Sequence, residues 1–583
     1  MSNQTVSDSC QKNVNTWLKG NYDQESKNEI LELQKNSPEE LNERFAQNLS
    51  FGTGGLRGLM GIGSNRMNIY TVRAASYGLC KYILRAGIQS SLSVVIGYDS
   101  RINSRLYAEE SAKVFAQNGV KAYLFKELTP TPLVSFACRY KQCAAAIVIT
   151  ASHNPSAYNG FKAYWSDGAQ VLPPHDVGII EEVSKIQDPA SIEVASLQNS
   201  LIEEINLDTE YIKEMSPLQQ YPQSNKEDGK DLKIVYTNLH GSGVNIVPKL
   251  LKDWGFSSFQ MIEKQKKPDG NFPTVSQPNP EDSAAMQLGI HEMLQSDADI
   301  LLGTDPDADR MGAIVKHNQG DYILDGNQIA CLLLDHIAHS LKEKGKLPKN
   351  AAFVTTIVST ELFAKIAKSY GASSFEVLTG FKYIAQLIRD WDKNQEHEFF
   401  FGAEESYGYL TGTKARDKDA VTACALICEA ALQAKKKGQT LVDKLYEIYE
   451  KHGIHCEKLM SVKFEESLAG HEKMRSIMQE LRKNPPHSLN GQALEVIEDY
   501  LSGETKNIKE KTSHRIDLPK SNVLILRLAD KSRIAIRPSG TEPKVKIYAS
   551  LCQESSGNVE EGLQILRSKA QALLQSTKEL LRP

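Results

Sequence analysis

A serine at position 152 directly follows a short apolar run and lies in a dense polar segment. The run 144–149 is followed by Thr150-Ala-Ser-His-Asn-Pro155 and then by Tyr158-Asn-Gly-Phe-Lys162. No Gly-x-Ser-x-Gly elbow surrounds the serine, and the side chains of neighbours such as Ser152 and His153 usually diverge, so a Ser–His hydrolase pair is disfavoured. A serine that carries a phosphoryl group needs a cation and an acid/base group nearby. A plain capped turn stays open as the alternative.

Three aspartates within five residues follow a second apolar run. Ile300-Leu-Leu302 leads into Asp305-Pro-Asp-Ala-Asp-Arg310. Alternate carboxylates in an extended loop are expected to converge on one side, which suits a hard cation such as Mg²⁺. An EF-hand is excluded because its sixth and twelfth positions hold Arg310 and Lys316 rather than Gly and Glu. The alternative is a solvated acidic turn.

Two further apolar runs end in polar loops. The run 398–401 leads into Gly402-Ala-Glu-Glu-Ser406, whose carboxylate and hydroxyl groups suit sugar hydroxyls, although a capped helix start is nearly as plausible. The run 533–536 leads into Arg537-Pro-Ser-Gly-Thr541, which has the donors of a phosphate cradle. The Gly-rich segment 51–58 is a weak signal, and Arg416-Asp-Lys-Asp419 is interpreted as surface charge.

Taken together, these loops fit phosphoryl transfer on a sugar phosphate. Because the chain has no nucleotide P-loop and no kinase Gly-rich loop, the phosphoryl donor is expected to be the enzyme itself. In open α/β sheets, ligands bind beyond the carboxyl ends of the strands, which is where all four loops stand.

The elements that position these loops are strands and helices in alternation. Segments 92–98 and 144–149 are apolar on both faces, a helix is expected near 107–118, and a strand pair near 312–323. Such runs predict mainly parallel sheets covered on both sides. The first ordered element is expected to be a helix entered at Ser37 through a capping box.

The domain organisation follows from length and from polar stretches. A chain of 583 residues is about four times the length of one typical domain. Linkers are predicted at 219–231 and 452–458, and the last segment, with edge-like strands near 522–528 and 533–536, is interpreted as a smaller α+β domain. We predict four domains: 1–222 with the serine loop, 223–319 with the aspartate loop, 320–458 with the Glu404 loop, and 459–583 with the Arg537 loop.

Composition and charge exclude several classes of protein. The net charge of −4 is too balanced for a basic nucleic-acid surface or a polybasic membrane surface, and no apolar stretch approaches the 18 or so residues that span a bilayer. No secretory signal is visible, and nine scattered cysteines without a Cys-x-x-Cys pair fit a reduced compartment. The expectation is a cytoplasmic protein with no nucleic-acid or membrane partner; its oligomeric state stays open.

The four loops resemble the signature loops of the α-D-phosphohexomutase superfamily, in the family's order. The segments 51–57 and 65–70, together with the length, resemble its long phosphoglucomutase/phosphopentomutase branch. The resemblance implies an α/β fold: three related α/β domains with mixed sheets and a C-terminal α+β domain similar to the TATA-binding protein, around a central cleft. Two departures, Ala403 in the third loop and Glu542-Pro-Lys-Val-Lys546 after the fourth, remove no chemical group.

The resemblance also implies roles for individual residues. Ser152 would be the phosphoserine and, with Asp305, Asp307 and Asp309, a ligand of Mg²⁺. Lys162 would be the general acid/base, which requires a depressed pKa, and Lys418 a second lysine of the cleft, against the surface-charge interpretation of that residue. His153 and Arg57 would be further catalytic residues, and Arg310 would steady the transferring phosphate. The sugar would be oriented by a loop with Thr379, Gly380 and Lys382, and its hydroxyls would be bound by Glu404 and Ser406. The non-reacting phosphate would be bound by Arg537, Ser539, Gly540 and Thr541.

The implied activity is a phosphomutase, an isomerase that interconverts glucose 1-phosphate and glucose 6-phosphate through a bound glucose 1,6-bisphosphate. The fourth domain is then expected to move, because a closed cleft traps the intermediate. Phosphopentomutase and glucose-1,6-bisphosphate synthase use the same machinery and stay open. From other classes, a phosphoserine-dependent phosphatase and a non-catalytic sugar-phosphate-binding protein remain alternatives.

Overall fold

The computed structural model describes residues 7–52, 54–87, 91–465, 468–539, 543–555 and 557–582. The chain forms two compact units: Met1–Ile329 with Ile384–Gly438, and Ala330–Tyr383 with Gln439–Pro583. Two of the three boundaries between them fall within helices α13 (Gly326–Glu343) and α15 (Phe381–Asn394), and the third follows Gly438. The predicted domain boundaries after residues 222, 319 and 458 stay predictions.

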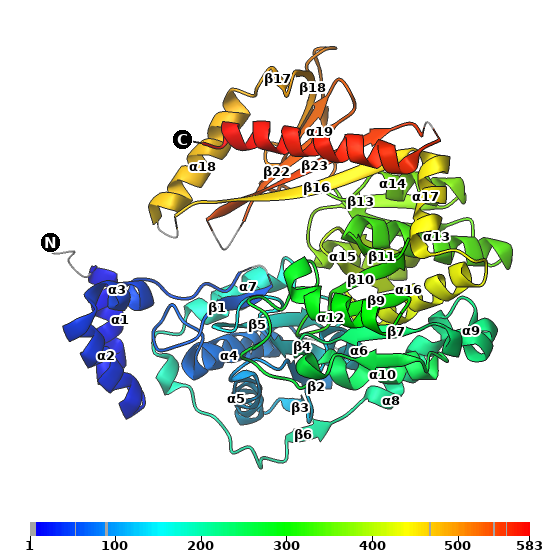
Figure 1. The fold of residues 1–583 in the computed structure, drawn as a ribbon. Coiled ribbons are helices and arrows are strands. Elements are labelled where there is room, and N and C mark those ends of the chain that lie inside the picture. The colour runs from blue at the N-terminus through cyan, green and yellow to red at the C-terminus, as the bar shows by residue number, and fades with distance from the viewer. Residues whose placement is uncertain are drawn as a thin grey trace. The chain divides into compact units, whose positions relative to one another are not determined.

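Three helices open the first unit (Figure 1, dark blue). They are α1 (Asp8–Lys19), α2 (Gln24–Asn36) and α3 (Pro38–Phe45). The expectation that the first element begins at Ser37 is therefore wrong, since α1 and α2 precede it. Ser37 is the N-cap of α3, but its side chain makes no capping hydrogen bond. The helices share a core that includes Trp17 and Phe45, a burial pattern that the short polar stretches of this segment concealed.

The next sheet carries the serine loop. Its strand order is β1-β5-β4-β2-β3-β6, with β2, β3, β4 and β6 parallel and β1 and β5 antiparallel to their neighbours. The strands are β1 (Gly55–Leu59), β2 (Ser91–Tyr98), β3 (Lys121–Phe125), β4 (Cys143–Ile149), β5 (Tyr158–Trp165) and β6 (Ile202–Ile205), and the helices are α4 (Ile69–Arg85), α5 (Ser104–Gln117), α6 (Thr131–Tyr140) and α7 (His175–Ser184). Every residue of β4 is buried, and each fully buried Ile or Val contributes about 1.5–3 kcal/mol.

A second mixed sheet carries the aspartate loop. Its order is β11-β10-β9-β7-β8, with β7, β8 and β9 parallel and β10 and β11 antiparallel. The elements are α8 (Asp208–Met215), α9 (Pro222–Asp228), β7 (Ile234–Thr237), α10 (Gly243–Asp253), β8 (Phe259–Met261), α11 (Glu263–Lys266), α12 (Ser283–Gln295), β9 (Ile300–Thr304), β10 (Met311–His317) and β11 (Gly320–Leu324). The predicted linker 219–231 is wrong in part, because it contains α9 and the buried Asn225, whose amide donates to the buried Glu429.

The first unit also contains the antiparallel pair β14 (Glu398–Glu404) and β15 (Gly408–Thr411), followed by helix α16 (Ala420–Lys435). Asp419 caps this helix by accepting a hydrogen bond from the Thr422 N–H. The pair places the Glu404 loop in the turn between its two strands.

The second unit contains the parallel pair β12 (Ala351–Thr356) and β13 (Ser373–Val377) and the C-terminal sheet. The order of that sheet is β16-β23-β22-β21-β18-β19-β20, and its pairs are antiparallel. Its elements are β16 (Ile454–Lys463), α18 (Leu468–Lys483), β17 (Ser488–Leu489), β18 (Gln492–Asp499), β19 (Glu504–Asn507), β20 (Thr512–Arg515), β21 (Leu524–Leu528), β22 (Arg533–Pro538), β23 (Lys544–Gln553) and α19 (Val559–Leu580), and α14 (Leu362–Ser369) and α17 (Leu441–His452) complete the unit.

Two expectations about this segment are wrong. The strands β21 and β22 lie inside the sheet rather than at its edge. The predicted linker 452–458 contains the start of β16, whose residues Ile454, His455 and Cys456 are buried. Both errors arise because a strand's place in a sheet depends on its partners and not on its own sequence.

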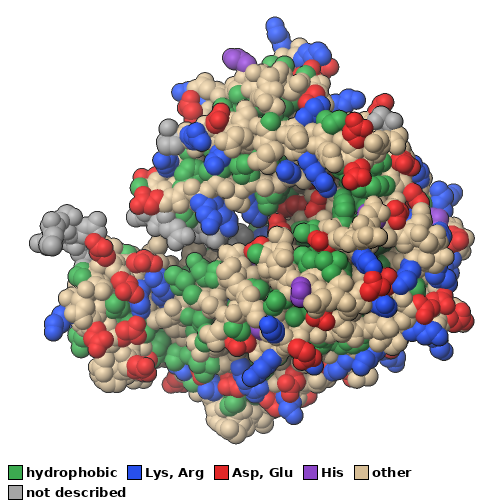
Figure 2. All heavy atoms as spheres, in the orientation of Figure 1, with side chains coloured by type: hydrophobic (Ala, Val, Ile, Leu, Met, Phe, Trp, Pro, Cys, Tyr) green, Lys and Arg blue, Asp and Glu red, His purple; other side chains and the backbone are tan. Residues whose placement is uncertain are grey.

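The charged side chains are mixed in sign on the face that Figure 2 shows, in keeping with the small net charge. Among the described residues, no helix combines the length and the apolar character that crossing a bilayer requires.

Candidate active site

Ser152 lies in the turn after β4 and is almost completely buried. Its backbone is left-handed, with φ of 51°. Its hydroxyl donates to Oδ2 of Asp305 at 2.8 Å and lies 3.1 Å from Nδ1 of His153. The expectation that the side chains of Ser152 and His153 diverge is therefore wrong, because the left-handed turn brings the two neighbours together.

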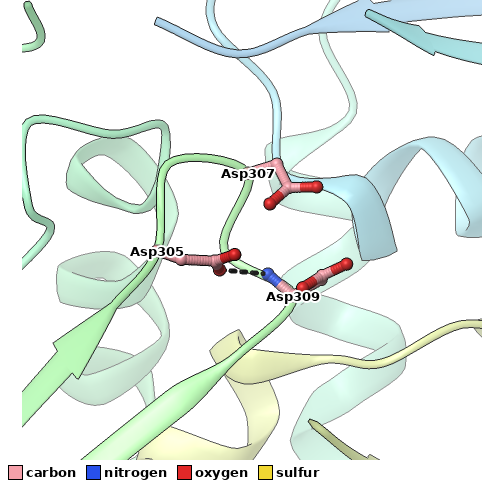
Figure 3. A group of neighbouring side chains, drawn as sticks. All are labelled: Asp305, Asp307 and Asp309. Atoms are coloured by element: carbon pink, nitrogen blue, oxygen red, sulfur yellow. Dashed lines mark hydrogen bonds between the residues drawn. The ribbon is translucent and has the colours of Figure 1, made fainter. Parts of the chain in front are cut away.

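Asp305, Asp307 and Asp309 follow β9 and form a cluster, with one oxygen from each carboxylate within 4.8 Å of the others. All three are buried, and Figure 3 shows their carboxylates around one common space. The loop is a turn rather than the expected extended segment: Ala308 has φ of 48°, and the Asp309 N–H donates to Oδ1 of Asp305 at 3.1 Å. The turn, not alternation along a strand, makes the carboxylates converge.

The cluster concentrates negative charge away from water. Burial, followed by the neighbouring Asp307 and Asp309, raises the pKa of Asp305 well above its ordinary value. Within the described part of the chain, Oδ1 of Asp307 and Oδ1 of Asp309 are buried without a hydrogen-bond partner. Converging carboxylates that retain oxygens without hydrogen-bond partners are typical ligands of a hard divalent cation. The residues thus fit a bound metal ion.

Two buried lysines lie against the cluster. Nζ of Lys162 is 2.7 Å from Asp307 and 3.0 Å from Asp309, and Nζ of Lys418 is 3.2 Å from Asp309 and 3.0 Å from Asp417. Burial lowers the pKa of Lys162, but Asp307 and Asp309 outweigh it, so that the net shift is upward. The expected depressed pKa of Lys162 is therefore wrong for this arrangement, because its nearest charges are carboxylates rather than cations.

The segment 416–419 is buried, which contradicts its interpretation as surface charge. Tyr164 donates to Asp417 at 2.8 Å, and Tyr211 donates to Asp419 at 2.6 Å. Lys418 between them extends over Gly408, where a Cβ atom would lie 2.2 Å from Cδ of the lysine. The glycine thus leaves the space in which Lys418 reaches Asp309.

The Glu404 loop adjoins the aspartate loop. Arg310 bridges to Gly408 through the backbone, and its Nη1 donates to the carbonyl of Ser406 at 2.9 Å. Glu404 is buried at the end of β14, and Ser406 is half-buried. Burial lowers the pKa of Arg310, but Asp309 and Asp305 outweigh it and raise the pKa overall.

Arg57 projects from β1, which pairs with β5, and its side chain is exposed. Its Nη1 donates to Oδ1 of Asn154 at 3.1 Å, two residues from Ser152. The first unit therefore brings together Ser152, His153, Lys162, Arg57, Asp305, Asp307, Asp309, Arg310, Glu404, Ser406 and Lys418.

The other predicted residues belong to the second unit. Thr379 and Gly380 lie between β13 and α15, with Gly380 at φ of 124°, and the Lys382 ammonium lies 5.4 Å from the centre of the Tyr383 ring. Arg537 lies in β22, and the Ser539 N–H donates to the Lys544 carbonyl at 2.8 Å. Gly540 and Thr541 lie outside the described residues. That these residues share one site with Ser152 stays a prediction.

Two buried residues after β2, Asp99 and Arg101, contact the serine loop and were missed by the sequence analysis. They directly follow the apolar run 92–98, so the strand-end rule that found Ser152 would have found them too. Thr131 was also missed. Its hydroxyl donates to Asp307 at 2.8 Å, and nothing in its local sequence marks it.

Comparisons with known proteins agree with this fold. Three family models match, described as phosphoglucomutase/phosphomannomutase alpha/beta/alpha domains I, II and III, at residues 48–190, 209–320 and 325–449. Phosphoglucomutases of Staphylococcus aureus strains MRSA252 and MSSA476 are each 40% identical over 518 residues, 88% of this chain and 91% of theirs.

Two solved structures share the fold. A phosphoglucomutase/phosphomannomutase family protein from Burkholderia thailandensis has a TM-score of 0.64 at 17% identity, covering 91% of this chain and 97% of its own. The open form of parafusin, a phosphoglucomutase from Paramecium, has a TM-score of 0.65 at 17% identity, covering 91% and 95%.

These findings confirm three expectations: the superfamily and its phosphoglucomutase branch, the α/β fold class with three related domains and a C-terminal antiparallel-sheet domain, and a phosphomutase that is an isomerase. The family models together match more than half of the chain. The chain belongs to the phosphoglucomutase/phosphomannomutase family.

Proposed function

We propose that this chain interconverts glucose 1-phosphate and glucose 6-phosphate through a phosphoserine at position 152. The single observation that carries the proposal is the 2.8 Å hydrogen bond from Ser152 to Asp305, which joins a buried nucleophile to the three-carboxylate cluster. The choice of glucose rests on the phosphoglucomutases that are 40% identical over 88% of the chain.

Mg²⁺ is the proposed cofactor, held by Asp305, Asp307 and Asp309 together with an oxygen on Ser152. The unpartnered oxygens of Asp307 and Asp309 support this assignment, as does the preference of Mg²⁺ for carboxylate and phosphate oxygens. When bound, the ion supplies a positive charge that offsets the negative charge of a transferring phosphoryl group.

The cationic side chains of the first unit are proposed to hold the transferring phosphoryl group and to manage protons. Lys162 is the proposed acid/base group. Its raised pKa keeps it an ammonium while Asp307 and Asp309 face it, so it is arranged to give a proton, and it can accept one only after those contacts weaken. Arg310, beside Asp309, and Arg57, beside the serine turn, are proposed to steady the phosphate.

The substrate is proposed to be oriented by hydrogen bonds to its hydroxyls and to its second phosphate. Glu404 and Ser406 are the proposed readers of sugar hydroxyls, with Thr379, Gly380 and Lys382 as the sugar-orienting loop. Arg537, Ser539, Gly540 and Thr541 are the proposed site for the non-reacting phosphate, and guanidinium and hydroxyl donors suit that group. Glucose 1,6-bisphosphate is the proposed intermediate and activator. The proposed location is the cytoplasm, and the proposed organisation is the four domains predicted above.

The test measures both the chemistry and the sugar. Mass spectrometry of protein incubated with glucose 1,6-bisphosphate should find one phosphate on the Ser152 peptide. Ser152→Ala should lose this phosphate and reduce turnover at least about 1,000-fold. Ser156→Ala, in the same turn, should keep both the phosphate on Ser152 and the wild-type turnover. Absence of the phosphate, or turnover by Ser152→Ala within a few-fold of wild type, would refute the phosphoserine mechanism.

Substrate comparison then tests the glucose assignment. The kcat/KM for glucose 1-phosphate should exceed that for ribose 1-phosphate. A tenfold preference for ribose 1-phosphate would make the chain a phosphopentomutase, and release of inorganic phosphate in step with turnover would make it a phosphatase. Efficient bisphosphate formation from 1,3-bisphosphoglycerate would instead mark a bisphosphate synthase.

A further inference from the structure

The turn after β2 lies directly beside the turn that carries Ser152. Strands β2 and β4 are parallel neighbours, and Tyr98, the last residue of β2, pairs with Ile149, the last residue of β4. The carboxyl ends of the two strands therefore meet at one edge of the sheet. This register brings Asp99 and Arg101 against the serine turn.

Arg101 binds the backbone of the serine turn at four points. Its Nη1 donates to the carbonyls of Pro155 at 2.8 Å and Tyr158 at 3.0 Å, and its Nη2 donates to the carbonyls of Ser152 at 2.6 Å and Asn154. The side chain is fully buried. A guanidinium suits this task because its planar fork presents several donors at fixed angles, which an ammonium does not.

Phe272 lies against the guanidinium of Arg101, which is 5.0 Å from the centre of its ring. Gly270, in the same segment, packs so closely that a Cβ atom there would lie 2.4 Å from the Ile102 nitrogen. The aromatic ring packs against the guanidinium, and the close backbone contact fixes the segment that carries it.

Asp99 holds the same turn through a second set of contacts. It pairs with Nε of Arg101 at 3.3 Å and accepts a hydrogen bond from the Thr150 hydroxyl at 2.6 Å. The Thr150 oxygen in turn accepts the Ser152 N–H at 2.8 Å. The N–H and the carbonyl of Ser152 are thus both fixed, the first through Asp99 and Thr150 and the second by Arg101.

This double restraint acts on a residue in an unfavourable conformation. Ser152 has φ of 51°, which side chains other than glycine rarely adopt. Such a conformation persists only where the surroundings over-determine it. The Ser152 hydroxyl meets both Asp305 and His153 in this conformation.

We propose that Arg101 is a positioning residue for phosphoryl transfer: it clamps the turn 152–158 so that the Ser152 oxygen stays aimed at Asp305. The inference rests on the proposed phosphoserine role of Ser152. Arg101 touches no reacting atom, because the four acceptors of its Nη atoms are backbone carbonyls and its Nε pairs with Asp99. Loss of the clamp misplaces the nucleophile without removing any group that binds the sugar.

Arg101→Lys in the full-length protein is the first test. A single ammonium cannot reach four carbonyls, so kcat should fall about 10- to 100-fold, the usual cost of a misplaced reacting group. KM for glucose 1-phosphate should stay within about threefold, and Ser152 should take up phosphate from glucose 1,6-bisphosphate correspondingly slowly. The matched control is Arg105→Lys, because Arg105 is four residues away and half-exposed and contacts the Lys126 carbonyl rather than the serine turn; it should behave as wild type.

A second pair of variants removes the other half of the clamp in case Arg101 variants do not fold. Thr150→Val deletes the acceptor of the Ser152 N–H and should lower kcat in the same way, and Thr150→Ser, which keeps the hydroxyl, should recover most of the turnover.

Free guanidinium at millimolar concentration should partly restore kcat of Arg101→Ala and leave wild type unchanged.

The outcomes separate the two proposals. Wild-type protein that takes up no phosphate on Ser152 would overturn the proposed function. If wild type takes up phosphate, an Arg101→Lys or Thr150→Val protein that is less heat-stable but turns over at the wild-type rate per folded molecule would overturn the positioning role. A rise in KM with unchanged kcat would overturn it as well.

Discussion

The hydroxyl of Ser152 donates a 2.8 Å hydrogen bond to Oδ2 of Asp305, 153 positions later in the chain. The contact joins the turn after β4 to the turn after β9 within one compact unit. Burial and the adjacent aspartates raise the pKa of Asp305. The bond therefore connects a buried hydroxyl to a carboxyl group whose ionised form is disfavoured by its surroundings.

Because the three carboxylates lie close together, removing the charge of Asp305 should not lower the stability of the metal-free protein but should lower its activity. Asp305→Asn removes one buried charge, so without Mg²⁺ the free energy of unfolding should stay equal or rise by about 1 kcal/mol. Mg²⁺ binding should weaken at least about tenfold, because a carboxylate ligand is lost, and turnover should fall with it. Thermal unfolding with and without Mg²⁺ measures both effects. The exposed Asp321→Asn serves as the control, and a large loss of stability in metal-free Asp305→Asn would contradict the repulsion.

Gly408→Ala should displace the Lys418 side chain without changing its chemical groups. The added methyl would lie 2.2 Å from Cδ of the lysine, so the lysine must move away from Asp309. We expect a loss of about 1–3 kcal/mol in stability and a fall in kcat of about 10- to 100-fold. Gly320→Ala, where the nearest atom lies at 3.8 Å, is the matched control. The double variant with Lys418→Met should be little worse than either single variant, and fully additive losses would show that Gly408 acts elsewhere.

The location of the site could be predicted from the sequence because it depends on a local signal. Apolar runs that end in polar residues mark strand ends, and Ser152, Asp305 and Glu404 each stand at or just after one. The same reasoning failed where backbone conformation decides. Ser152 and Ala308 have a left-handed φ although neither is a glycine or asparagine, the residues that usually indicate this conformation. The contact between Ser152 and His153 depends on this conformation.

Burial of charge was the other point that the sequence could not reveal. The sequence analysis interpreted Lys418 and Asp417 as surface charge because lysine and aspartate side chains are usually exposed. They are buried because they pair with each other and with Asp309 and Tyr164. The last two residues come from distant parts of the chain, so no local pattern reveals them. Likewise, Glu429 is buried in helix α16 because the backbone N–H groups of Gln220 and Tyr221 donate hydrogen bonds to its carboxylate.

His455 should make stability depend on pH in the second unit. Burial, and then the nearby Lys365, lower its pKa to about 3, and Nζ of Lys365 is 3.0 Å from its Nε2. The unfolded chain binds a proton near pH 6.5, so between about pH 3 and pH 6.5 the unfolded state holds more protons than the native state. Stability therefore rises with pH across this window and is lost as pH falls.

The expected loss from pH 7 to pH 5 is about 2 kcal/mol from this one group. Hydrogen exchange of the β16 amides at the two pH values measures it locally. His455→Gln should flatten the dependence, while the exposed His514→Gln should not. Equal pH slopes for wild type and His455→Gln would rule out His455 as the cause.

Lys162 should compete with the metal ion for the aspartates. Its ammonium lies 2.7 Å from Asp307 and 3.0 Å from Asp309, so Lys162→Met leaves these buried carboxylates with less positive charge. Metal-free protein should lose about 3–5 kcal/mol of stability, and Mg²⁺ should then bind more tightly than to wild type and restore part of that stability. Turnover should nevertheless fall about 100-fold or more, because the proposed acid/base group is gone.

Calorimetric titration with Mg²⁺ compares the affinities directly. Lys162→Arg, which keeps the charge, should bind Mg²⁺ with an affinity close to that of wild type. Lys316→Met controls for loss of a lysine, since Lys316 pairs with the exposed Asp297 and not with one of the three aspartates. Weaker Mg²⁺ binding by Lys162→Met would mean that the lysine organises the three aspartates for the ion rather than competing with it, because an ammonium that only competes cannot strengthen metal binding by its presence.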